Sequence, residues 1–79
     1  MKQYKVEVLK KMIDNLTMNI KMFSKYPGSE ETLYGMVKQR RDLAALVEND
    51  GVAMEGVYVD SMSYFASAGA DTSWWTKGT

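Results

Sequence analysis

The chain contains no histidine and no cysteine among its 79 residues, and it has only one proline. Histidine most often transfers protons near neutral pH, so its absence removes the commonest acid–base chemistry. Without cysteine there is no thiolate nucleophile, no disulfide and no sulfur ligand for zinc. A chain of this length buries a small core, so its stability must come from helix packing or from a partner.

The chain also lacks long apolar runs and a clear excess of either charge. No segment reaches the roughly 20 apolar residues of a transmembrane helix, and the basic start is not followed by the apolar run of a signal peptide. We therefore expect cytoplasmic synthesis and no membrane partner. Residues 1–48 hold nine Lys and Arg against six Asp and Glu, whereas residues 49–79 hold one Lys against four acidic residues. These parts attract each other weakly, and the neutral total does not favour nucleic acid as a partner.

A first helix is predicted from about Gln3 to Ser24. Its apolar residues recur at alternating spacings of three and four, which is typical of a helix packed on an antiparallel neighbour. This seam consists of Val6, Leu9, Ile13, Leu16, Ile20 and Phe23, and Met12 widens it. Met18 lies nearly opposite the seam. We therefore consider a second contact surface of Met18, Met22 and Arg40, although single exposed apolar residues are common.

A second helix is predicted from Glu30 to Glu48, after a turn at Tyr26–Ser29. Pro27 cannot continue a helix, and Ser29 is a favourable N-cap residue for the helix that follows. The short turn makes the two helices antiparallel neighbours. The seam of the second helix consists of Leu33, Met36, Val37, Arg40, Leu43, Ala44 and Val47. Arg40 has two interpretations: a buried stem with its guanidinium in water, or an anchor for a partner's carboxylate.

Beyond Gly51 the composition shifts to glycine, serine, threonine and aromatic residues. Asp60 can cap a short helix that runs to Ala68, whereas residues 52–59 fit either an extended or a helical conformation. The predicted fold class is all-α. It is an antiparallel helical hairpin (residues 1–49) with a short third helix and an extended C-terminal arm (residues 50–79), all in one domain.

The arm carries five of the nine aromatic residues, and these are the predicted partner-binding residues. Tyrosine and tryptophan dominate interface hot spots because they bury large, rigid surfaces. The five residues are Tyr58, Tyr64, Phe65, Trp74 and Trp75. The alternative is that the arm covers the hairpin's own apolar face. For the two tryptophans, which lie near the terminus, we favour a partner.

No pattern in the sequence predicts a catalytic, cofactor-binding or metal-binding site. Glu30 and Glu31 fit the start of a helix, and the acidic residues of the arm do not have the spacing of a calcium loop. The expected function is therefore non-enzymatic, with no cofactor and no small-molecule substrate. We expect an accessory or structural subunit of a larger protein assembly.

The small, methionine-rich chain favours a bacteriophage virion as that assembly, in which the chain would be a minor capsid or head-associated protein. Two alternatives remain open. One is a small regulatory or inhibitory protein that docks on a host enzyme, such as a phage-encoded anti-defence protein. The other is a homo-oligomeric helical bundle.

Overall fold

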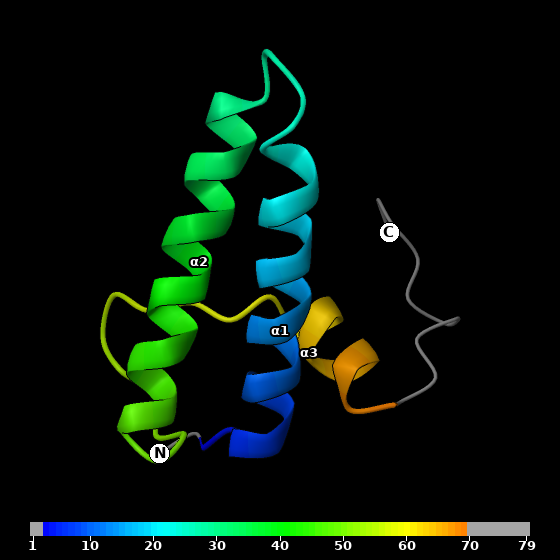
Figure 1. Cartoon of the computed structure of the whole chain (residues 1–79). Helices are drawn as coiled ribbons and strands as arrows, with labels where there is room; N and C mark the ends of the chain where they lie inside the picture. Colours follow the sequence, from blue (N-terminus) through cyan, green and yellow to red (C-terminus); the bar gives the residue numbers. More distant parts are fainter. Residues whose placement is uncertain (1–2, 70–79) are drawn as a thin grey trace, which may run out of the picture.

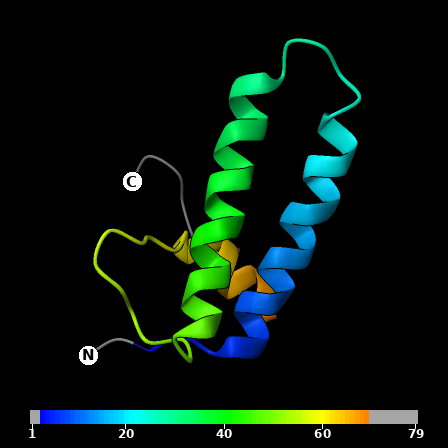
Figure 2. The ribbon, with the colours of Figure 1, turned by 60° about the vertical axis from the view of Figure 1, so that its left-hand side comes forward.

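The fold is an antiparallel helical hairpin with a short third helix beside it (Figure 1). The computed structural model describes residues 3–69. Helix α1 spans Val6–Phe23, α2 spans Glu30–Glu48 and α3 spans Ser61–Ser67. In both ribbon views α1 and α2 lie side by side, and α3 crosses α1 near the end of the hairpin opposite the turn (Figure 2). Over residues 3–69 the predicted all-α fold class is confirmed.

Helix α1 begins three residues later than predicted because the preceding residues pair with the segment after α2. The backbone N–H of Tyr4 donates to the carbonyl oxygen of Gly51 at 2.7 Å. Gln3 forms an isolated antiparallel bridge with Val52, and its side-chain amide donates to the carbonyl oxygen of Asp50 at 3.1 Å. These bonds join the beginning of α1 to the end of α2 and close the open end of the hairpin.

The hairpin turn forms where it was predicted, and Ser29 occupies the N-cap position of α2, but its side chain does not cap the helix. Ser29 has φ −103° and ψ 16°, which is not the extended geometry of a typical N-cap, and its side chain makes no capping hydrogen bond. Its hydroxyl group instead contacts the carbonyl oxygens of Phe23 and Tyr26 at 2.9 and 2.7 Å. Ser29 therefore closes the turn onto the end of α1. The predicted bounds of α2 are confirmed.

The hydrophobic core lies at the open end of the hairpin. Its buried members come from the first half of α1 and the second half of α2. They are Val8, Leu9, Met12, Leu43 and Leu46. Partly buried residues from the arm and the N-terminal segment also pack against this cluster, namely Val57, Val59, Tyr64 and Tyr4. The arm therefore completes the core of the hairpin.

The predicted seams are only partly correct. Val8 and Leu46 are buried although neither belongs to a predicted seam, while Phe23, Val37 and Ala44 are exposed although all three do. Val8 and Leu46 are buried because the arm and the N-terminal segment pack at the open end, whereas Phe23 and Val37 lie beyond their reach. Ala44 lies at the open end but on a face of α2 that stays exposed. Burial therefore follows the position along the hairpin as well as the face of each helix.

The third helix is confirmed close to its predicted bounds. The Asp60 carboxylate accepts from the backbone N–H of Met62 at 3.0 Å and of Ser63 at 3.5 Å, so Asp60 is the N-cap of α3. Between α2 and α3, residues 53–59 form neither a helix nor a strand. The C-terminal part of the arm, residues 70–79, lies outside the described residues.

Helix α2 ends in a Schellman motif. The two residues after its C-cap both have positive φ angles. Asp50 has φ 57° and Gly51 has φ 80°. The backbone N–H of Gly51 donates to the carbonyl oxygen of Leu46 at 2.8 Å, and that of Asp50 donates to Val47 at 3.1 Å. A Cβ atom on Gly51 would collide with the backbone carbonyl of Tyr4. Glycine is therefore required here by both conformation and space.

We predict that Gly51→Ala destabilises the protein more than Gly56→Ala. Both residues have φ 80°, so each substitution should cost about 1–2 kcal/mol of unfolding free energy for the left-handed conformation. Only Gly51 has a neighbour in the way, whereas Gly56 has no atom within 4 Å. Urea unfolding followed by circular dichroism measures the difference. Equal losses in the two variants would show that the contact with Tyr4 does not constrain the fold.

Candidate interaction surface

Large apolar and aromatic side chains are more numerous on the surface of residues 3–69 than in the core. Nine are exposed, compared with five buried hydrophobic residues. The exposed set is Met18, Met22, Phe23, Tyr26, Tyr34, Val37, Met54, Tyr58 and Phe65. The first six fall within residues 18–37, which form the half of the hairpin next to the turn. We call residues 18–37 the distal end.

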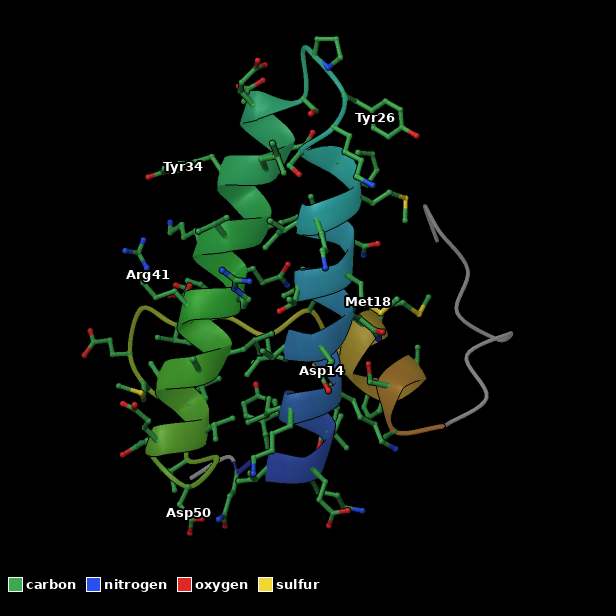
Figure 3. The ribbon with its side chains drawn as sticks, in the orientation of Figure 1. Asp14, Met18, Tyr26, Tyr34, Arg41 and Asp50 are labelled. Carbon is green, nitrogen blue, oxygen red and sulfur yellow. The ribbon has the colours of Figure 1, made fainter. Side chains whose placement is uncertain are left out.

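The distal end presents aromatic side chains on two sides of the hairpin. Tyr34 is 71% exposed and points away from α2, while Tyr26 is 59% exposed and lies on the other side (Figure 3). The rings of Phe23 and Tyr26 pack edge to face, with centroids 6.3 Å apart. Neither α3 nor the loop before it reaches the turn (Figure 1). These side chains are thus left without cover from the described part of the chain.

A groove of about 350 Å³ lies between α1 and α3. Its apolar lining comes mostly from one face of α1, with one contribution from α3. These residues are Met12, Leu16, Met18, Met22 and Ala66. Its polar lining is uncharged and consists of Asn15, Asn19, Gln39, Ser63 and Ser67. Met18 and Met22, two members of the predicted second surface, therefore lie together in this groove.

Arg40, the third member of the predicted second surface, is not among the residues that line the groove. It is half-buried, and its Nη1 donates to the hydroxyl oxygen of Thr17 at 3.3 Å. The Thr17 hydroxyl in turn donates to the carbonyl oxygen of Ile13 at 2.8 Å. Arg40 thus joins α2 to α1 within the chain, a contact that neither of its two predicted interpretations included.

The predicted partner-binding residues of the arm occupy different environments. Tyr64 packs against the core, and its ring meets that of Tyr4 edge to face at a centroid distance of 5.3 Å. The Tyr64 hydroxyl oxygen accepts from the backbone N–H of Lys5 at 3.1 Å. Phe65 contacts the Tyr64 ring and remains 41% exposed, while Tyr58 is 83% exposed. Tyr64 therefore contributes to the fold of its own chain, whereas Tyr58 is available to a partner.

Trp74 and Trp75 lie outside the described residues. Among residues 3–69, no group of three or more His, Cys, Asp and Glu side chains comes together to hold a metal ion. No helix in this range is long and apolar enough to cross a bilayer. Comparisons with protein-family models, curated proteins and solved structures gave no significant match.

None of the three aromatic residues of the distal end was among the predicted partner-binding residues. Tyr34 follows Leu33 directly and lies off the predicted seam of α2, so helical periodicity alone indicates that its side chain is exposed. Phe23 and Val37 were instead placed on the seams. Their exposure could not be inferred from periodicity, because it depends on where the arm packs.

We predict that Tyr64→Phe lowers the unfolding free energy by about 0.5–1.5 kcal/mol, because it removes the acceptor of the Lys5 N–H. Tyr58→Phe is the matched control, since the same atom is removed from a side chain that is 83% exposed. Its effect should stay within about 0.5 kcal/mol. Urea unfolding measures both variants. A loss of the same size in the two would contradict a structural role for Tyr64.

Proposed function

We propose that this protein is a non-enzymatic accessory subunit of a larger protein assembly, and that its distal end binds a neighbouring protein. One observation carries the proposal. Within residues 3–69, the buried residues gather at the open end of the hairpin, while six of the nine exposed large side chains lie in residues 18–37. A small chain that leaves this much apolar surface uncovered gains stability when a partner covers it.

The residue types at the distal end suit a protein partner. A buried aromatic side chain removes about 150–250 Å² from water. At about 25 cal/mol per Å², this contributes a few kcal/mol before the cost of ordering the interface is subtracted. Tyr26 and Tyr34 also keep a hydroxyl group that can form hydrogen bonds at the interface rim. Tyr26 and Tyr34 lie on different sides of the hairpin. A partner that contacts both therefore needs a concave surface that surrounds the distal end.

The loop before α3 offers a separate contact. Tyr58 and Met54 are both exposed there and lie outside the distal end. Tyr58 is the most exposed large hydrophobic side chain among residues 3–69, and it keeps its predicted partner-binding role in this proposal. A chain held by its turn and by this loop would contact its neighbours at two places.

The assembly that we favour is a bacteriophage virion, with the chain as a minor capsid or head-associated protein that is incorporated after cytoplasmic synthesis. Its small size and its seven methionines support this part of the proposal. The alternatives predict other partners. An inhibitory protein would present the distal end to one host enzyme, and a homo-oligomeric bundle would present it to another copy.

Site-specific photo-crosslinking tests the proposal directly. A photoreactive amino acid replaces Tyr34 at the distal end, and the matched control carries it at Lys10, which is exposed near the open end of α1. Both variants are illuminated in the cells that produce the native protein or in the particles that contain it. Mass spectrometry then identifies the crosslinked products. We expect one dominant protein adduct from Tyr34 and none of comparable yield from Lys10.

The identity of the adduct separates the candidate functions. A capsid or head protein supports the virion assignment, a soluble host enzyme supports the inhibitor, and a second copy of this chain supports the bundle. Equal, diffuse labelling from both positions would contradict a binding role for the distal end.

A further inference from the structure

We propose that the groove between α1 and α3 holds at least one indole of the chain's own Trp74–Trp75 pair. This inference goes beyond the proposed function. Met18 and Met22 belong to the distal end, but its other four exposed side chains do not line the groove and stay available to a partner, namely Phe23, Tyr26, Tyr34 and Val37. Three of the seven methionines in the sequence line this one groove. Met18 and Met22 are 66% and 50% exposed, so the described part of the chain leaves this apolar surface largely uncovered.

The lining of the groove suits an indole ring. Methionine sulfur atoms make favourable contacts with aromatic rings, and the flexible thioether side chain adapts to a flat group. The amide side chains of Asn15, Asn19 and Gln39 supply carbonyl oxygens that can accept from the indole N–H. Among residues 3–69, no side chain that lines the groove carries a charge, so an apolar side chain can enter without desolvating an ion of this part of the chain.

The length of chain beyond α3 is sufficient to reach any part of the groove. Ser67, the last residue of α3, already belongs to the groove lining. Trp74 follows Ser67 by seven positions, and a chain covers at most roughly 3.3 Å per position, or about 23 Å in total. The lining of α1 extends from Met12 to Met22, which is about 15 Å at 1.5 Å per helical residue.

The same short connection favours this chain's own indoles over those of a second copy. A flexible linker of a few residues gives an effective concentration on the order of millimolar for the attached group. A second copy at lower concentration therefore competes poorly. Gly69 has φ 83°, which allows the backbone to change direction directly after α3.

Tryptophan fluorescence of the full-length protein tests this inference. In the single-tryptophan variants Trp74→Phe and Trp75→Phe, the remaining indole reports its own environment. Because the two indoles are adjacent in the sequence and the groove measures about 350 Å³, we expect one of them to enter it more deeply than the other. That indole should show blue-shifted emission and at least twofold weaker acrylamide quenching than the free amino acid. These values should not change over a hundredfold dilution.

A charge in the groove should remove this protection. Met18→Lys places an ammonium group against the indole and should bring emission and quenching to the values of an exposed tryptophan. Met54→Lys is the matched control, because Met54 is an exposed methionine outside the groove, and it should leave the protection unchanged. Far-UV circular dichroism confirms that both variants keep their helices.

Three results would overturn the inference. The first is full exposure of both indoles in the single-tryptophan variants. The second is protection that disappears on dilution, which would assign the groove to a second copy. The third is protection that survives Met18→Lys. Since none of these results concerns the side chains around the turn, the proposed function stands or fails separately by crosslinking at Tyr34.

Discussion

The fold depends on the packing of three fully buried leucines at the open end of the hairpin. Leu9 from α1 meets Leu43 and Leu46 from α2 in one cluster, and all three side chains have no solvent-accessible surface. Replacing a buried leucine with alanine typically costs about 2–5 kcal/mol. A small domain has a total stability of about 5–15 kcal/mol, so each of these leucines carries a large share of it.

The position of this cluster explains how the rest of the molecule is arranged. The N-terminal segment, the residues after α2 and the ring of Tyr64 all pack against it, so the connections that close the fold lie at one end. The turn at the other end depends on helix pairing, the Ser29 hydroxyl and the link between Arg40 and Thr17. Stability and exposed apolar surface are therefore separated along the hairpin. This separation is what makes the distal end suitable for a partner.

Local signals in the sequence were sufficient for the helices but not for the core. Pro27 predicts the break between α1 and α2, and Asp60 predicts the start of α3, because each acts on its own neighbours. The burial of Val8 and Leu46 depends on contacts with residues far away in the sequence, which helical periodicity does not encode. The same limit applies to the site. Met18 was singled out because it lies off the seam, whereas the groove beside it exists only because α3 packs on α1.

Amide hydrogen exchange of the full-length protein tests the central claim most directly, namely that the stability of the fold resides at the open end. We expect the slowest exchange in residues 8–13 and 43–49, where the buried cluster holds both helices, and clearly faster exchange in the helical residues of the distal end. Uniform protection along α1 and α2 would contradict the account. So would the strongest protection beside the turn, because it would show that the distal end is stabilised within the chain itself.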